Sequence, residues 1–102
     1  MEIRNFNDSI EKFIKSLEKQ TIAKVIHTID LLEEFGHRLG LPHSKKVRGE
    51  LFELRVRGVQ EIRILYTFHK SYIVLLHGFI KKSQKIPKKE INKALARLRV
   101  LD

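Results

Sequence analysis

The chain has 102 residues, 42% of them hydrophobic, and a formal net charge of +9. Its length and hydrophobic content fit one small domain, residues 1–102, with a single core. The absence of cysteine excludes disulfide bonds, and residues 1–5 lack the basic start and apolar run of a signal peptide. The longest apolar stretch, Ile73–Leu76, is far too short to span a membrane. We therefore expect a soluble cytoplasmic protein.

The basic residues are distributed unevenly along the chain. Residues 1–36 contain five basic and seven acidic residues, whereas residues 37–102 contain sixteen basic and five acidic residues. Such an asymmetry is typical of a protein that binds a polyanion, and nucleic acid is the usual candidate. The alternative is a basic surface that is only solvated. A steep salt dependence of binding would distinguish the two.

The first third of the chain predicts an edge strand and two helices. Residues 2–6 alternate as a strand does, and Asp8 is a candidate N-cap with Glu11 in the capping-box position. Thr21 is the expected cap of a second helix, which Gly36 ends. The apolar positions of both helices follow the i, i+3, i+4, i+7 spacing: Ile10, Phe13, Ile14 and Leu17, then Ile22, Val25, Ile26, Ile29, Leu32 and Phe35. The short connection favours an antiparallel helix hairpin.

The rest of the chain predicts a loop, a three-stranded antiparallel meander and a last helix. Residues 37–50, HRLGLPHSKKVRGE, show no periodicity and contain Gly and Pro, which favours a loop. Three apolar runs follow at Leu51–Val56, Ile62–Phe68 and Tyr72–Ile80, separated by turn-prone residues. After a basic connector, Pro87 fits the first position of a helix. The apolar stripe of this helix is Ile91, Ala94, Leu95 and Leu98.

These elements predict an α+β fold in the order β-α-α-β-β-β-α. We expect an antiparallel sheet, with the N-terminal helix hairpin packed on one face and a C-terminal helix beside it. The apolar stripes of the helices need a partner, and the apolar face of the sheet supplies one. All helices are therefore expected on the same face, which leaves the other face bare.

Strand alternation gathers charged residues on that bare face, because alternate residues of a strand share a face. In this reading Leu76 points to the core side with Gly78 and Ile80, and Tyr66 packs in the core. The charged residues expected together on the bare face are Glu53, Arg55, Arg63, His77 and Lys81. Such a set suits RNA cleavage without a metal. That reaction needs a base for the ribose 2′-OH, cations for the phosphorane and a proton for the leaving oxygen.

Each of these residues has a candidate role in cleavage and an ordinary structural alternative. Arg63 and Lys81 are candidates for holding the phosphate, and Arg55 for fixing a carboxylate. Glu53 and His77 are candidate proton handlers. Alternatively, Glu53 only pairs with a neighbouring arginine across the strands, and His77 is a packed histidine.

Motifs for other chemistries are missing from the sequence. The five histidines have no close ligand pairing, so a metal site is poorly supported. The glycine-rich motifs of nucleotide-binding proteins and of elbow-type hydrolases do not occur. We expect no cofactor and no bound metal.

The sequence resembles the phage-derived, Gp49-like branch of HigB toxins in the RelE/ParE superfamily of toxin–antitoxin systems. The resemblance spans roughly residues 1–99 and is most specific in the run LLHGFIKKSQKIP. The other resembling segments are LGLPHSKK (39–46), LFELR (51–55) and RILY (63–66), followed by Pro87, Glu90, Ile91, Ala94 and Arg97.

The resemblance implies a ribosome-dependent mRNA endoribonuclease that a helix-turn-helix, HigA-like antitoxin neutralises. On that pattern Arg63 and Lys81 are the cations for the phosphate and the transition state, and Glu53 and Arg55 belong to the LFELR motif. The terminal catalytic tyrosine of some relatives has no counterpart here, since Tyr72 is the last tyrosine. The basic residues expected to bind RNA or the ribosome are Lys45, Lys46, Arg48, Lys82, Lys85, Lys88 and Lys89.

Two other functions fit the sequence. A ParE-like protein of the same fold would inhibit DNA gyrase without catalysis, and it would not require the cations to meet on one face. A basic nucleic-acid-binding module that cleaves nothing is the third reading. Induction of the protein separates them: cut mRNA supports the nuclease, DNA damage the gyrase inhibitor, and unaffected growth the binding module.

Overall fold

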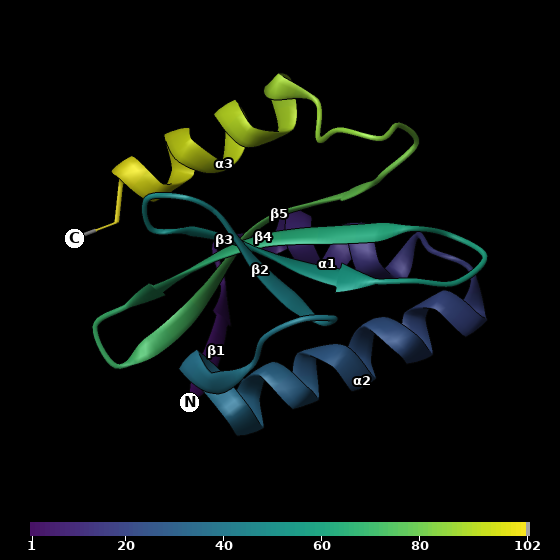
Figure 1. Ribbon diagram of the computed structural model, residues 1–102, viewed down its shortest axis with the longest axis horizontal. Helices are drawn as coiled ribbons and strands as arrows, with labels where there is room; N and C mark the ends of the chain where they lie inside the picture. Colours follow the sequence, from purple (N-terminus) through teal and green to yellow (C-terminus); the bar gives the residue numbers. More distant parts are fainter. Residues whose placement is uncertain (102) are drawn as a thin grey trace.

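The computed structural model describes residues 1–101, which form a five-stranded sheet with helices on both of its faces (Figure 1). The elements in chain order are β1 (Glu2–Asn5), α1 (Asp8–Lys15), α2 (Lys19–Phe35), the short 3-10 helix η1 (Gly36–Arg38), β2 (Ser44–Arg48), β3 (Leu51–Val56), β4 (Ile62–His69), β5 (Tyr72–Ile80) and α3 (Lys88–Arg99). The predicted α+β class is confirmed.

The sheet is mixed and has the strand order β1-β5-β4-β3-β2. The predicted meander of β3, β4 and β5 is confirmed, and its strands pair antiparallel. The prediction of a wholly antiparallel sheet was wrong, because β1 pairs parallel with β5. Helices α1 and α2 and strands β2, β3 and β4 all lie between these two strands in the chain, and a parallel pair requires a long connection of this kind.

The prediction of a loop over residues 37–50 was wrong for its second half. Residues 44–48 form β2, an edge strand that pairs antiparallel with β3. Lys45, Lys46 and Arg48 are exposed, and only Ser44 is buried. The apolar alternation that marks a strand is therefore absent, and pairing with β3 holds β2 in place instead.

Helices α1 and α2 pack on one face of the sheet, as predicted. Their apolar residues join Leu54, Val56, Ile62, Ile64, Tyr66, Ile73 and Leu75 in the larger hydrophobic cluster. The layout is looser than the expected hairpin, because α1 contacts mainly β5 and α2 mainly β3, with few contacts between the two helices. The Tyr66 side chain is buried in this cluster, as predicted, and its hydroxyl hydrogen-bonds Ser44.

Helix α3 packs on the opposite face, so the prediction that all helices share one face was wrong. Ala94 joins a second hydrophobic cluster with Leu51, Leu65, Val74, Leu76 and Phe79, and Ile91, Leu95 and Leu98 pack against it. Figure 1 shows α3 and α2 on opposite sides of the sheet. Part of the face that was expected to be bare is thus apolar, and α3 covers it.

A bulge in β5 changes the orientation of Leu76. Leu65 pairs with His77 and Tyr66 pairs with Leu75, so Leu76 is an extra residue in β5. Leu76 consequently packs in the second cluster with Phe79. Its predicted place on the other face was wrong, because simple alternation cannot anticipate a bulge.

The predicted caps of α1 and α2 were each misplaced. The side chain of Asn7 accepts a hydrogen bond from the Ser9 backbone amide at 2.9 Å, which makes Asn7 the N-cap and Asp8 the first helical residue. Helix α2 begins at Lys19 without a side-chain cap, and Thr21 is buried inside the helix. The predicted end at Gly36 is confirmed, since this glycine follows α2 with a positive φ of 53°.

Gly78 lets α1 approach β5, and replacing it with alanine should destabilise the fold. An added Cβ would lie 2.6 Å from Cδ2 and 2.7 Å from Cε2 of Phe13. Because the ring would have to move within a packed core, we expect Gly78→Ala to lower the free energy of unfolding by about 1–3 kcal/mol in urea titrations. Adding Phe13→Leu to the Gly78→Ala protein should recover part of the lost free energy of unfolding.

Gly40→Ala is the matched control. A Cβ at this position meets nothing within 4 Å in the described part of the chain. The change in unfolding free energy should stay below about 0.5 kcal/mol. Equal losses for the two alanine variants would show that the contact with Phe13 is not the reason for a glycine at position 78.

Candidate functional site: a basic groove beside α3

Two adjoining pockets form a groove on the face of the sheet that carries α3. Their volumes are about 290 Å³ and about 430 Å³, and they share Arg55, Arg63, Lys81 and Gln84. We call the combined surface the cation groove. Its lining consists of Lys45, Lys46, Val47, Glu53, Arg55, Arg57, Glu61, Arg63, Lys81, Lys82, Ser83, Gln84 and Ile86.

Arg63 lies at the floor of the cation groove. It is 2% exposed, although it lines both pockets. Its Nη1 donates to Oε2 of Glu61 at 3.2 Å and to the carbonyl oxygen of Ile62 at 3.0 Å. These contacts fix the plane of the guanidinium before any ligand arrives, which is what an electrostatic site requires.

Glu53 lies among three cations. It pairs with Lys45 of β2 in the sheet register, and its carboxylate oxygens lie 3.5 Å from Nε of Arg55 and 4.0 Å from Nε of Arg63. The two arginines are themselves direct partners across β3 and β4. Like charges directly opposite each other are destabilising, so the buried carboxylate of Glu53 offsets their repulsion.

The two arginines face Glu53 through their Nε atoms without a hydrogen bond. Nε of Arg55 and Nε of Arg63 are buried and have no hydrogen-bond partner within the described residues. Seven cationic side chains and two carboxylates line the groove. This excess of positive charge suits an anion such as a phosphate group, which guanidinium groups can bind with two parallel hydrogen bonds.

Lys81 is held at the rim by the connector between β5 and α3. Its backbone amide donates to the carbonyl of Glu61 at 2.7 Å, and its Nζ donates to the carbonyl of Gln84 at 2.9 Å. The connector thus folds back to place Gln84 and Ile86 in the wall of the groove. Arg63 and Lys81 lie on the same side of the sheet and line the same two pockets.

His77 shares this sheet face, but it is not among the residues that line the groove. Its Nε2 lies 2.8 Å from Oε1 of Glu90 in α3, and the two side chains are 12% and 18% exposed. Burial lowers the pKa of His77, and the hydrogen bond that its ring donates to the Glu90 carboxylate only partly opposes this effect. The structure places His77 as a link between β5 and α3 rather than beside Arg63.

The lowered pKa of His77 predicts a stability that falls on acidification. The unfolded chain takes up the proton near the ordinary pKa of about 6.5, whereas the folded chain takes it up only at lower pH. The free energy of unfolding should therefore decrease as the pH falls from about 7.5 to about 5. His77→Gln, which has no proton to gain, should show a flatter profile in urea titrations. An identical slope in both proteins would contradict this assignment.

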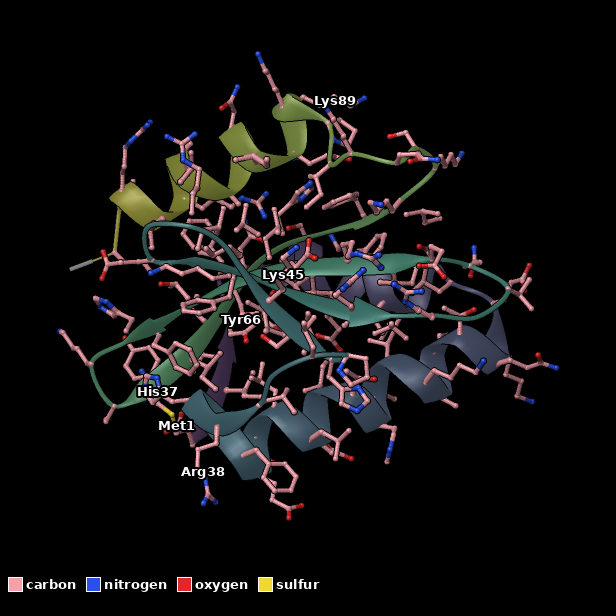
Figure 2. The ribbon with its side chains drawn as sticks, in the orientation of Figure 1. Met1, His37, Arg38, Lys45, Tyr66 and Lys89 are labelled. Atoms are coloured by element: carbon pink, nitrogen blue, oxygen red, sulfur yellow. The ribbon has the colours of Figure 1, made fainter. Side chains whose placement is uncertain are left out.

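The other predicted RNA-binding residues divide into two sets. Lys45, Lys46 and Lys82 line the cation groove. The residues that are exposed outside it are Arg48, Lys85, Lys88 and Lys89. Figure 2 shows Lys45 over the sheet and Lys89 at the start of α3, pointing away from the sheet.

Several residues of the groove were not anticipated as site residues. Arg57 has the same strand parity as Arg55, and this signal was visible in the sequence. Glu61 is the carboxylate that holds Arg63. Gln84 and Ile86 come from a connector whose path no periodicity predicts.

Residues 1–101 contain no group of three or more side chains placed to ligate a metal. None of the helices described there is long and apolar enough to cross a membrane.

The fold and the site define a class: a small α+β protein whose five-stranded mixed sheet carries a basic, arginine-rich groove beside its last helix. Comparison with known proteins assigns the chain to a family. Residues 12–99 match the family described as phage derived protein Gp49-like (DUF891). The chain belongs to this family, which is RelE-like and toxin-like. A search of curated proteins gave no match.

Proposed function

We propose that the protein is the toxin of a type II toxin–antitoxin system, a HigB-type, metal-independent endoribonuclease with a RelE-like topology that cuts mRNA on the ribosome. The observation that carries the proposal is the arginine pair formed by the buried Arg63 and the partly buried Arg55, bridged by Glu53 next to Lys81. Membership of the Gp49-like family supports it.

Cleavage would proceed by attack of the ribose 2′-oxygen on the adjacent phosphorus. The P–O5′ bond breaks, the 2′-OH gives up its proton, and the departing 5′-oxygen takes one up. Negative charge grows on the non-bridging oxygens as the phosphorane forms. Arg63 and Arg55 place positive charge at the groove floor, and Lys81 adds a cation at the rim.

Proton transfer in this scheme falls to groups other than His77. His77 is bound to Glu90 under α3. The carboxylates that line the groove are Glu53 and Glu61. Glu53 is buried between the guanidiniums and suits the task of orienting them. The side chain of Glu61 is 39% exposed, which makes it the more accessible proton acceptor.

The exposed lysines outside the groove are suited to binding ribosomal RNA. Lys85, Lys88 and Lys89 follow one another along the connector and the start of α3, next to the groove wall. Such a surface would be attracted to ribosomal RNA in a salt-dependent way. A helix-turn-helix, HigA-like antitoxin would neutralise the protein by covering the basic surface with acidic or apolar segments, either closing the groove or blocking entry to the ribosome.

Brief induction in a bacterial host, followed by mapping of transcript ends, tests this function. We expect new mRNA ends within translated regions and an early loss of protein synthesis. Damage to DNA with intact transcripts would instead indicate a gyrase inhibitor. Normal growth with intact transcripts would indicate a basic protein that binds nucleic acid without cutting it.

A further inference from the structure

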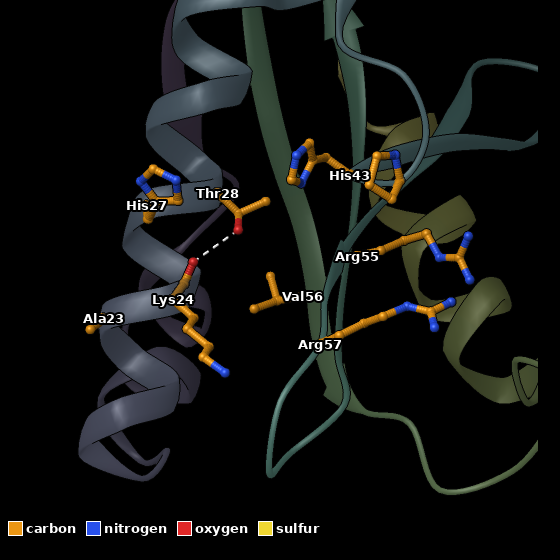
Figure 3. Close-up of a pocket in the computed structure, with 9 residues that line it drawn as sticks. Ala23, Lys24, His27, Thr28, His43, Arg55, Val56 and Arg57 are labelled. Carbon is orange, nitrogen blue, oxygen red and sulfur yellow. Dashed lines mark hydrogen bonds between the residues drawn. The ribbon is translucent and has the colours of Figure 1, made fainter.

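A separate pocket of about 410 Å³ lies between α2 and the C-terminal end of β3 (Figure 3). We call it the α2 pocket. Its lining residues are Ala23, Lys24, His27, Thr28, Pro42, His43, Arg55, Val56 and Arg57. It is on the α2 side of the sheet, whereas the cation groove is on the α3 side.

The chemistry of the α2 pocket favours a ligand that is largely apolar and attached to an anion. Ala23, Pro42 and Val56 supply apolar surface, and most of the exposed lining is apolar. The charged residues of its rim are all basic: Lys24, Arg55 and Arg57, and carboxylates are absent from the lining. By contrast, the apolar groove formed by α1, α2 and β1 contains Glu11, Asp30 and Glu33 in its lining.

Two imidazoles lie at the α2 pocket as well. His27 comes from α2, and His43 comes from the segment before β2. Figure 3 shows them on the two sides of the pocket. Imidazole rings and arginine planes are the groups on which unpaired bases stack in RNA-binding proteins.

The α2 pocket and the cation groove meet at the edge of β3. Arg55 and Arg57 line both. β2 begins at Ser44, and just before it the carbonyl of His43 accepts a hydrogen bond from the Arg55 amide at 2.8 Å. In Figure 3 Val56 points toward α2, while the two arginine side chains extend away from it. A chain lying over this edge would therefore contact both surfaces.

We propose that the α2 pocket binds a base of the substrate RNA, in a nucleotide next to the phosphate that the cation groove holds. This inference rests on the proposed function. The base lies on the apolar surface of Ala23 and Val56, an imidazole stacks on it, and its phosphate passes over the β3 edge to Arg55 and Arg57. The α2 pocket would then influence which nucleotides flank the cut.

Methyl NMR of the full chain tests the proposal without any cleavage. The methyl groups of Ala23, Thr28 and Val56 report on the α2 pocket, and those of Val47 and Ile86 report on the cation groove. The probes are 2′-O-methyl RNA trinucleotides, which lack the attacking hydroxyl, and inorganic phosphate. We expect a trinucleotide to shift both sets of methyl groups and phosphate to shift only the groove set.

Lys24→Glu reverses a charge at the rim of the α2 pocket. It should weaken trinucleotide binding about fivefold to tenfold. Lys19→Glu is the control, because it makes the same change in the same helix at a residue that lines neither surface. It should weaken binding less than about twofold. Equal weakening by the two variants would overturn the proposal.

The remaining outcomes separate this proposal from the proposed function. Shifts confined to Val47 and Ile86 would overturn the base site and leave the nuclease proposal intact. An acidic peptide that shifts the α2 pocket methyl groups when no trinucleotide does so would assign the pocket to a protein partner and overturn the base site. Shifts at both surfaces from a trinucleotide, in a protein that cuts no mRNA, would support the base site and contradict the nuclease.

Discussion

Replacing Arg63 with alanine is expected to lower the rate of mRNA cleavage by about 10²–10³-fold, the usual cost of removing one donor from a transition-state site. The guanidinium is buried at the groove floor, already oriented by Glu61 and the Ile62 carbonyl. It therefore needs no reorganisation as charge develops on the phosphorane. The measurement is the single-turnover rate of cutting on programmed ribosomes.

Three further variants show whether the loss of cleavage rate in Arg63→Ala comes from the chemical step. Arg63→Lys keeps the charge but loses the planar fork, and it should recover only part of the rate. Lys81→Ala should also lower the rate of cleavage, although it leaves the residues at the floor of the cation groove unchanged. Lys12→Ala, an exposed change in α1 away from the groove, should leave it unaltered. Since Arg63 is buried, each variant is checked for a cooperative thermal transition. Full activity in folded Arg63→Ala and Lys81→Ala proteins would remove both residues from the mechanism.

Replacing Glu53 with glutamine is expected to lower the free energy of unfolding by about 3 kcal/mol, measured in urea. The substitution keeps the shape of the side chain but removes its charge. Arg55 and Arg63, whose side chains are 20% and 3% exposed, would then face each other across β3 and β4 with no carboxylate between them. A buried cation that loses its counter-charge is costly, and two opposed cations add their repulsion.

The control and a compensating variant make this expectation specific. Glu50→Gln removes an exposed carboxylate and should change the free energy of unfolding by less than about 0.5 kcal/mol. Arg55→Met in the Glu53→Gln background removes one of the opposed cations and should recover part of the lost stability. A Glu53→Gln protein as stable as the Glu50→Gln protein would mean that Glu53 does not hold the two guanidiniums.

The elements of the fold that could be predicted were those with strong apolar periodicity. The three strands 51–80 and the helical spacing of α1, α2 and α3 were visible in the sequence. β2 was not, because its lysines are exposed and pairing with β3 stabilises it. The position of α3 was also missed. Leu51 and Leu65 make the opposite face of the sheet partly apolar, and strand parity alone does not say which helix covers which face.

The residues of the candidate site could be predicted where strand alternation alone determines the face of the sheet on which they lie. Glu53, Arg55 and Arg63 meet as alternation requires, and Lys81 joins them one residue after β5. The position of His77 under α3 depends on its contact with Glu90, a long-range pairing that spacing does not reveal. The partner of Arg63 at Glu61 lies only two residues away on the same strand parity, so this contact was within reach of the sequence. The connector wall at Gln84 was not, because the path of the connector follows no periodicity.

The most direct measurement of the central claim is the chemistry of the cut itself. Ribosomes are programmed with an mRNA cut by the wild-type protein and with the same mRNA carrying a single 2′-deoxynucleotide on the 5′ side of that cut. We predict a 5′-hydroxyl on the downstream fragment and no cutting at the deoxy position, in the presence of a metal chelator that the ribosomes tolerate. Cutting of the deoxy substrate at the same position, or a 5′-phosphate on the product, would contradict attack by the 2′-oxygen in the cation groove.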